Sequence, residues 1–542
     1  MSVPTSFSTI CTKNCKQELI GFLLSLSLHQ PNAKTYVICD TETKQYILDS
    51  TPQPLLDIKW YVELDKYSQY NRSEMVSRGI WDEFQMQKAT VIEKALKTEK
   101  DTLFLDSDTI ILDKLFIEDS TKELGVSPQF IKQKNVDETG YYNGGMLWTN
   151  QKTLPDKWRH YTKTSRYHDQ ASIEDLARDY NTFEYGDNYN LQTWRFILGT
   201  DTPQQVASNV NVRSNKIYYK DKPLKFIHTH FNSDRFKNVN EFLISKMKEA
   251  KLYKELAIVY RVINNKWVLQ IPKQPMNGLF RHNNDSYREL AILMKVKNQD
   301  VDIEFSTQSG HCWLKPNILT YDRPTLEWVN KEVNNTSLIL LGNGSIEHEG
   351  KQLIDNGFIV KPWIFWSRRP MFLEKILKKY GIIPIEKRSI SSIFIGNYEN
   401  SVQAKYRVKD NNDWKSVIEE FHCTSGTKHK FTQEEYLMKL RESKFGLCLR
   451  GYGSKCHREV ELMAFGVIPL ITPDVSIDSY YDPPIENKHY FRVNKPEDVL
   501  NIINTTTVEK LKEMSKNCYE WFQKNVHSDN AWNNMIKKIL YS

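Results

Sequence analysis

Apolar and polar residues alternate along residues 1–115 in a pattern that predicts β-strands separated by helices. Strands in this order form a parallel sheet with helices on both faces. Ligands of such sheets bind at the carboxyl ends of the strands, so polar residues that follow a strand are candidates for a binding site. Apolar runs indicate strands at 7–11, 35–39, 58–62 and 103–105, and helical spacing indicates helices at 16–28 and 84–96.

One of these strands ends in two carboxylates. Residues 102–112 read TLFLDSDTIIL, with Asp106 and Asp108 between two apolar stretches. In an extended segment the side chains at i and i+2 point the same way, so both carboxylates are expected to aim at one point. Two oxygen ligands at this spacing suit Mg²⁺ or Mn²⁺. Asp-Ser-Asp-Thr is also common in turns, but the apolar flanks favour a strand within a sheet.

A second α/β pattern begins near residue 265, after a polar helical stretch at 238–262 that is expected to carry the chain across. We therefore predict two α/β domains, 1–265 and 266–542. In the second domain the pattern predicts strands at 338–341, 390–395, 445–449 and 467–472, and helices at 369–379, 433–442, 455–464 and 508–525.

Composition narrows the class of protein. The chain has 542 residues, 40% hydrophobic and 26% charged, which is ordinary for a globular protein. Its net charge of +7 comes from 74 basic and 67 acidic residues without a Lys/Arg block, so nucleic-acid binding is not expected. The mild positive balance suits an anionic substrate.

The cysteines and the apolar segments bear on location. The eight cysteines form no paired CxxC sites, which argues against structural zinc and favours free thiols in a reducing compartment. The apolar segment 19–28 is far shorter than the ~20 residues of a membrane span, so no transmembrane segment is expected. These features predict a cytoplasmic protein, located in the host cytoplasm if the source is a virus.

Polar landmarks in the first domain follow one another in a characteristic order. Lys88 lies in the helix before the carboxylate pair Asp106 and Asp108. Then come Asn143-Gly144-Gly145 within YNGGMLW, Asp169-Gln170 within HDQ, and His228 within FIHTH. In this order the landmarks resemble the GT-A glycosyltransferases over residues 7–231, most closely the family 8 and glycogenin-type enzymes.

The resemblance implies a Rossmann-like GT-A fold and sugar transfer from a nucleotide sugar, a UDP- or GDP-sugar, to a glycan or glycoconjugate acceptor. It implies a bound Mn²⁺ or Mg²⁺ and retention of anomeric configuration. It also implies the site: metal ligands Asp106, Asp108 and His228; donor contacts Lys88, Asp106, Asn143, Gly144 and Gly145; and catalytic residues Asp169 and Gln170.

Other interpretations of these residues stay open. Asp169 is also suited to a helix N-cap, and Gly144-Gly145 to a β-bulge. The Gly-x-Lys-Pro-Trp segment that follows the metal-binding histidine in the family is replaced here by FNS at 231–233. His230 alternates onto the same side of its strand as His228, so either could be the third ligand, and position in the pattern favours His228.

A different class is also compatible with the carboxylate pair. A DxDx(T/V) box opens the haloacid dehalogenase phosphatases, in which Asp106 would be the nucleophile, but here Thr109 comes one position early. That fold places the box on its first strand, whereas about 100 residues of α/β pattern come before it here.

The second domain contains a glycine-rich loop between a predicted strand and helix. Residues 443–453 read SKFGLCLRGYG, and 455–470 read KCHREVELMAFGVIPL. Glycines before a helix N-terminus let its free N–H groups face a phosphate. The pattern resembles the exostosin-type, family 47-like half of a GT-B glycosyltransferase, in which inversion is usual. The implied donor-binding residues are Arg450, Gly451, Gly453, Arg458 and Glu461, and His311 is a candidate catalytic base.

The two patterns together predict a bifunctional glycosyltransferase that builds a glycan from two nucleotide-sugar donors. The alternative is one active GT-A module fused to a GT-B-like module that only binds carbohydrate. The phosphatase is the third hypothesis.

Overall fold

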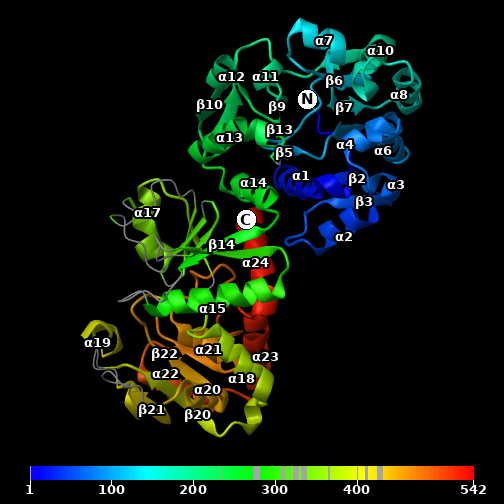
Figure 1. Cartoon of the computed structure of the whole chain (residues 1–542). Helices are drawn as coiled ribbons and strands as arrows, with labels where there is room; N and C mark the ends of the chain where they lie inside the picture. The colour runs from blue at the N-terminus through cyan, green and yellow to red at the C-terminus, as the bar shows by residue number, and fades with distance from the viewer. Residues whose placement is uncertain are drawn as a thin grey trace. The chain divides into compact units, whose positions relative to one another are not determined.

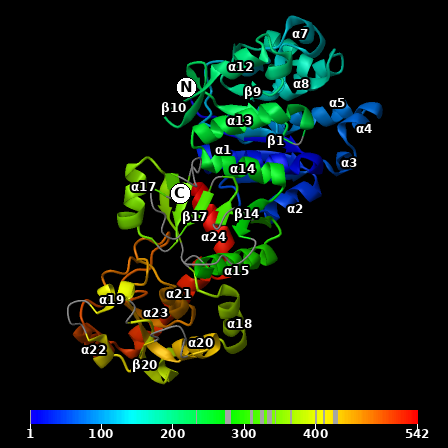
Figure 2. The same cartoon turned by 60° about the vertical axis from the view of Figure 1, so that its left-hand side comes forward.

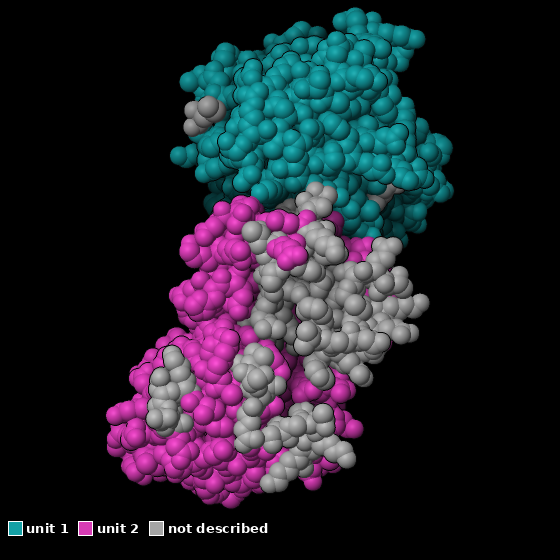
Figure 3. Space-filling model, turned by 90° about the vertical axis from the view of Figure 1, so that its left-hand side faces the viewer, with its two compact units in different colours: residues 1–266, 541 teal, residues 267–540, 542 magenta. Residues whose placement is uncertain are grey.

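The computed structural model separates the chain into two compact units, residues 1–266 with Tyr541 and residues 267–540 with Ser542 (Figure 3). We call them unit 1 and unit 2. The residues that it describes are 2–231, 233–272, 281–306, 312–316, 318–321, 327, 329–330, 338–342, 344–363, 366–398, 401–408, 413–423 and 431–542.

Unit 1 is built on a seven-stranded sheet of order β3-β2-β1-β4-β7-β6-β8 (Figure 1). Strands β1 to β4 pair in parallel, whereas β7 is antiparallel to both of its neighbours. The predicted α/β class, with a Rossmann-like sheet, is confirmed. The strands are β1 (Phe7–Cys11), β2 (Lys34–Cys39), β3 (Asp57–Val62), β4 (Thr102–Leu105), β6 (Leu124–Pro128), β7 (Tyr142–Thr149) and β8 (Thr182–Glu184).

One apolar cluster joins this sheet to several helices. Strand residues such as Ile38, Phe104 and Leu147 pack with Ile92 and Trp158, all at most 1% exposed. The helices that contribute two or more buried residues to it are α6 (Gln87–Leu96), α8 (Leu154–Thr162) and α10 (Ile173–Asp179). The single helix predicted at 84–96 is two helices, since α5 (Trp81–Gln85) ends before α6 begins.

Helices α1 (Lys16–His29) and α14 (Tyr253–Asn264) lie side by side outside that cluster (Figure 2). Gly21 permits the close approach, because a Cβ there would stand 2.5 Å from Val262 Cγ2. The segment predicted as one polar connecting helix is therefore two, α13 (Lys237–Glu249) and α14, and α14 buries an apolar face within unit 1.

A small sheet of order β5-β13-β9 adjoins the carboxyl end of β4. Its strands are β5 (Thr109–Ile111), β13 (Phe226–His228) and β9 (Asn190–Gln192). Ser107 and Asp108 form a turn that connects β4 of the large sheet to β5 of the small one. The strand ends before Asp106, as predicted, but the extended geometry expected from Asp106 to Asp108 is replaced by this turn.

The remaining elements of unit 1 lie around these two sheets. A third sheet has the order β10-β11-β12, with β10 (Val210–Arg213), β11 (Lys216–Tyr219) and β12 (Lys222–Pro223). The other helices are α2 (Thr41–Asp49), α3 (Asp65–Ser68), α4 (Arg72–Ser77), α7 (Gln133–Thr139), α9 (His168–Ala171), α11 (Arg195–Leu198) and α12 (Pro203–Asn209).

Unit 2 contains two sheets. The first has the order β15-β14-β16-β17-β18-β19 and the second, wholly parallel, β21-β20-β22-β23-β24. The strands are β14 (Trp267–Pro272), β15 (Val301–Ser306), β16 (Cys312–Leu314), β17 (Ile318–Tyr321), β18 (Leu338–Leu341), β19 (Val360–Pro362), β20 (Ile390–Gly396), β21 (Glu420–Cys423), β22 (Ser443–Cys448), β23 (Ile468–Ile471) and β24 (Phe491–Arg492).

The strands and helices predicted in the second domain are present within about three residues of their predicted bounds. Of the six-stranded sheet only β18 was predicted. The helices of unit 2 are α15 (Arg281–Lys297), α17 (Lys351–Asp355), α18 (Pro370–Tyr380), α19 (Ser401–Arg407), α20 (Gln433–Arg441), α21 (His457–Ala464), α22 (Pro496–Thr505), α23 (Val508–Asn525) and α24 (Ser528–Tyr541). Among the helices described, none is both long and apolar enough to cross a membrane.

Candidate metal centre of unit 1 and cavity of unit 2

Asp106, Asp108 and His228 form a group of three metal-binding side chains in unit 1. Each offers one ligand atom, and the three atoms lie within 4.8 Å of one another. The donor set of two carboxylates and one imidazole suits Mn²⁺ or Mg²⁺. The residues present therefore fit the divalent cation that the sequence predicted, while the identity of the metal stays a prediction.

Backbone hydrogen bonds fix the positions of these ligands. Asp106 N donates to Gly145 O on β7 at 3.0 Å, and Thr229 N donates to Asp108 O at 2.9 Å. Strand β13 pairs with β5, so that His228 lies opposite Thr109, the residue after Asp108. The three side chains converge because two sheets meet at the 106–108 turn.

The charges within this group oppose one another. Burial raises the pKa of Asp106 above its ordinary value, although Lys88 opposes the rise. Burial would also raise the pKa of Asp108, but His228 and His230 outweigh it and hold that pKa well below its usual range. Burial would lower the pKa of His228, and the Asp108 carboxylate raises it instead. Two neighbouring, partly buried carboxylates form a setting that a bound cation stabilises.

Lys88 is buried between two carboxylates. Its ammonium lies 3.0 Å from Asp169 Oδ2 and 3.3 Å from Asp106 Oδ1, and it donates to Gly144 O at 3.0 Å. Burial by itself would lower the pKa of Lys88, yet the two carboxylates raise it above its ordinary value. An ammonium has three N–H donors, so this geometry occupies all of them within the protein.

Gly144 and Gly145 on β7 lie directly against the charged groups. A Cβ on Gly145 would stand 2.5 Å from His228 Cε1 and 2.6 Å from Asp106 Oδ2. A Cβ on Gly144 would stand 2.8 Å from Asp169 Oδ2. Only glycine leaves the space that these side chains occupy.

The polar neighbours of these glycines form hydrogen bonds within the protein. Gln170 accepts from Gly144 N at 3.3 Å and donates to Thr139 O at 3.0 Å, which uses both ends of its amide. Asn143 accepts from Gly145 N at 3.0 Å and donates to Gln192 Oε1 at 3.1 Å. The structure thus brings Lys88, Asp106, Asp108, Asn143, Gly144, Gly145, Asp169, Gln170 and His228 together in one region.

His230 also contacts the metal-binding group. Its position in the sequence alone did not decide between His228 and His230 as the third ligand. His228 Nε2 lies 3.0 Å from Asp108 Oδ1, and His230 Nδ1 lies 3.1 Å from Asp108 Oδ2. The indole N–H of Trp194 donates to His230 Nε2 at 3.1 Å. Sequence reasoning missed Trp194, because nothing in the sequence pairs it with His230.

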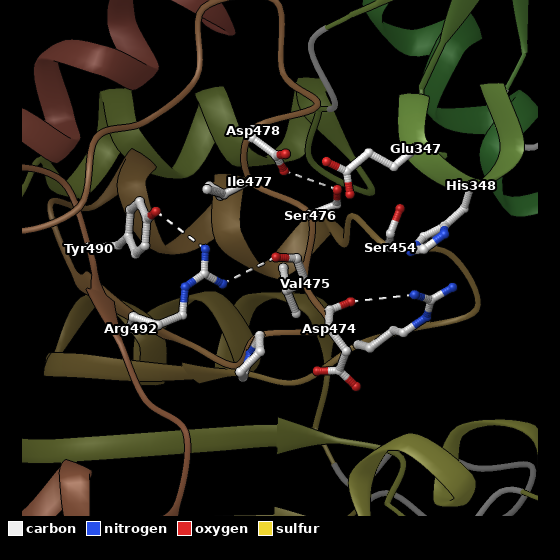
Figure 4. A pocket seen from close by; sticks show the side chains of 12 residues that line it. Glu347, His348, Ser454, Asp474, Val475, Ser476, Ile477, Asp478, Tyr490 and Arg492 are labelled. Atoms are coloured by element: carbon white, nitrogen blue, oxygen red, sulfur yellow. Dashed lines mark hydrogen bonds between the residues drawn. The ribbon is translucent and has the colours of Figure 1, made fainter. Parts of the chain in front are cut away.

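Unit 2 contains a cavity of about 370 Å³ at the carboxyl ends of β18, β22 and β23. Figure 4 shows its charged and polar lining, with Arg492 close to Val475 and Tyr490. Most of the side chains come from the segments that follow these strands, which is where ligands of parallel sheets bind, and Tyr490 and Arg492 come from the start of β24. The lining residues are Glu347, His348, Arg450, Ser454, Pro473, Asp474, Val475, Ser476, Ile477, Asp478, Tyr490 and Arg492.

Of the residues that the sequence proposed for a second donor site, Arg450 lines this cavity, and Gly451 and Gly453 follow it in the chain. Arg458 instead donates to Ile395 O at 2.6 Å, and its guanidinium lies 4.5 Å from the centre of the Phe394 ring. His311 lies outside the described residues.

Glu461 is turned toward the protein. Its carboxylate accepts from Arg368 N at 3.0 Å and from the Tyr436 hydroxyl at 2.7 Å. Sequence reasoning also missed His348, Asp474 and Arg492 of the cavity. The rule that ligands bind at the carboxyl ends of strands, applied to β18 and β23, identifies the first two.

Comparison with known proteins gives the following result. No model of a protein family matches the chain, and no curated protein matches it. Among solved structures, a galactosyltransferase LgtC in complex with donor and acceptor sugar analogues aligns with 44% of this chain and 95% of its own, at 13% identity and a TM-score of 0.30. An active-site mutant of LgtC aligns over the same shares at 13% identity and a TM-score of 0.29. An identity of 13% with a TM-score of 0.30 carries no conclusion about function, so the function is inferred from the side chains of this protein.

Proposed function

We propose that unit 1 is a metal-dependent glycosyltransferase that moves a sugar from a nucleoside-diphosphate sugar to an acceptor hydroxyl. One observation carries the proposal: the Asp106-Asp108-His228 group lies beside the buried Lys88–Asp169 pair at the carboxyl end of β4. A bound Mn²⁺ or Mg²⁺ would neutralise the negative charge that develops on the departing nucleoside diphosphate.

Lys88 serves as a positioning residue in this proposal. Its contacts with Asp106 and Asp169 hold a metal ligand and a second carboxylate on either side of one ammonium. Its charge also balances part of the negative charge of the site, so that an anionic donor can approach. The contact with Gly144 O ties this pair to β7, the strand proposed to line the donor sugar.

Asp169 is the proposed catalytic residue of the pair. Its carboxylate is buried, and a Cβ at Gly144 would stand 2.8 Å from Oδ2, so Asp169 lies against the strand proposed to line the donor sugar. A carboxylate there can stabilise positive charge at the sugar carbon or orient a sugar hydroxyl. Gln170 takes a supporting part, since its amide is hydrogen-bonded to backbone at both ends.

The reaction replaces one bond at the sugar carbon by another. The bond from that carbon to the diphosphate oxygen breaks, and a bond to the acceptor oxygen forms as the acceptor hydroxyl loses its proton. A UDP- or GDP-sugar and a glycan or glycoconjugate are the proposed substrates.

The test measures nucleoside diphosphate release by the full chain from a panel of sugar nucleotides, with Mn²⁺ and with EDTA. We expect release that needs the metal and is lost in Asp106→Asn. Asp156→Asn is the matched control, because the Asp156 side chain is 87% exposed on α8. Release that persists in EDTA and in Asp106→Asn would overturn the proposal, and an aspartyl-phosphate on Asp106 would favour a phosphatase.

The cavity of unit 2 supports a second candidate function, that of another donor-binding site. Arg450 and Arg492 bring two guanidinium groups to one cavity, and such groups bind phosphate oxygens. Arg450 Nε is buried without a hydrogen-bond partner among the described residues. His348, from the helical turn that follows β18 of the other sheet, lines the same cavity and is the proposed catalytic base.

A second donor that the full chain turns over in EDTA would support two transferase sites in one protein. Loss of that turnover in Arg492→Gln, with the metal-dependent release unchanged, would assign it to the cavity. Binding of a glycan without turnover would instead favour a carbohydrate-binding module.

A further inference from the structure

Two histidines hold the two oxygens of Asp108. His228 Nε2 lies 3.0 Å from Oδ1, and His230 Nδ1 lies 3.1 Å from Oδ2. The three side chains whose ligand atoms converge are Asp106, Asp108 and His228, and His230 is not one of them. His230 therefore reaches the site through Asp108.

The proton positions on His230 follow from its other neighbour. The Trp194 indole N–H lies 3.1 Å from His230 Nε2, and an indole nitrogen only donates. His230 Nε2 must then be the acceptor. A neutral imidazole carries its proton on the other nitrogen, so Nδ1–H donates to Asp108 Oδ2.

The surroundings keep both rings in place. The Trp194 ring contacts Phe236 edge-on with centroids 4.9 Å apart, and the Arg235 guanidinium lies 4.6 Å from the indole centre. The His230 and Phe236 ring centroids are 5.1 Å apart, and Asn240 Nδ2 donates to His230 O at 3.2 Å. The chain Trp194–His230–Asp108 is thus built from packed groups.

We propose that His230, with its tautomer fixed by Trp194, is a positioning residue for the metal ligand Asp108. Its N–H holds Oδ2 and so presents Oδ1 toward His228 and the cation. Hydrogen-bond partners of this kind orient a metal ligand, and their loss costs about 10- to 100-fold in metal affinity. This inference rests on the proposed metal-dependent function.

The experiment titrates the full chain with Mn²⁺ alone and follows the free ion by electron paramagnetic resonance. His230→Ala removes the donor and is expected to weaken Mn²⁺ binding about 10- to 100-fold. His230→Asn places an amide N–H near the position of Nδ1, and its affinity is expected to stay close to wild type. Trp194→Phe keeps the ring contacts, and we expect it to weaken binding in wild type but not in the His230→Asn background.

The outcomes separate this inference from the function on which it rests. Failure of the wild-type chain to bind Mn²⁺ would reject the metal centre itself, and the positioning role with it. Wild-type binding that is unchanged in a folded His230→Ala chain would reject only the positioning role. Loss of a directly bound nitrogen in the electron spin echo spectrum of His230→Ala would show that His230 is a ligand, which also overturns the proposal.

Discussion

Gly145 offers the sharpest test of how closely the metal centre is packed. A methyl group at this position on β7 would stand 2.5 Å from His228 Cε1 and 2.6 Å from Asp106 Oδ2. Both neighbours belong to the metal-binding group. The substitution Gly145→Ala therefore adds one carbon between two ligands without changing any charge.

The size of the effect follows from these distances. Moving His228 from 2.5 Å to the 3.4 Å of ordinary contact needs a shift of about 0.9 Å. Misplacement of about 1 Å in a preorganised site can cost about 100-fold, so we expect Mn²⁺ affinity and metal-dependent release to fall by about that factor. Overpacking of this kind also lowers the free energy of unfolding by about 1–3 kcal/mol.

The assay combines Mn²⁺ titration with urea unfolding. Gly125→Ala is the matched control, because its Cβ would stand 2.5 Å from Phe183 Cζ in the same large sheet, away from the metal-binding group. We expect the control to lose stability and keep its Mn²⁺ affinity. A folded Gly145→Ala chain that binds Mn²⁺ like wild type would refute the reasoning.

Three further predictions concern stability, each followed by urea unfolding. Lys88→Met leaves two carboxylates without their shared cation and is expected to cost about 3–5 kcal/mol. Lys94→Met, at an ion pair whose side chains are 21% and 42% exposed, should cost less than about 1 kcal/mol. Equal losses would contradict the role of burial. Gly21→Ala forces α1 away from α14 and should cost about 1–3 kcal/mol, and Val262→Ala in the same chain should recover part of it; strictly additive losses would argue against the contact. Burial lowers the pKa of His489 to about 4, so the stability that its neutral ring contributes is lost as the pH falls from about 6.5 to about 4; His489→Asn should lose less stability than wild type between pH 7 and pH 5, and identical losses would count against this assignment.

Local sequence predicted much of the secondary structure. Strand β1 has its predicted bounds, and β2, β3 and β4 begin one residue early, because short apolar runs bounded by polar residues indicate buried parallel strands. Strands β14 to β17 and β19 of the six-stranded sheet were missed. Strand β16 is antiparallel to both neighbours and lacks the intervening helix that marks a parallel strand in sequence. This reason does not apply to β14 and β15, which pair in parallel and have α15 between them.

The order of landmarks along the chain pointed to the region of the candidate site. Asp106, Asp108 and His228 were predicted as a group, although His228 follows Asp108 by about 120 residues in sequence. The reason given for the convergence of the carboxylates was wrong, since a turn between two sheets brings them together. A one-dimensional pattern records which residues follow a strand, but it does not show when the chain leaves one sheet for another.

The sequence by itself determined the α/β class, the periodicity of many strands and helices, and the residue types able to bind a divalent cation. Only the tertiary structure decided which side chains form hydrogen bonds and ion pairs with one another. Lys88 between Asp106 and Asp169 and the chain from Trp194 through His230 to Asp108 depend on contacts between elements far apart in sequence. Hydrogen bonds and ion pairs act over about 3–4 Å, and folding alone brings distant residues within that range.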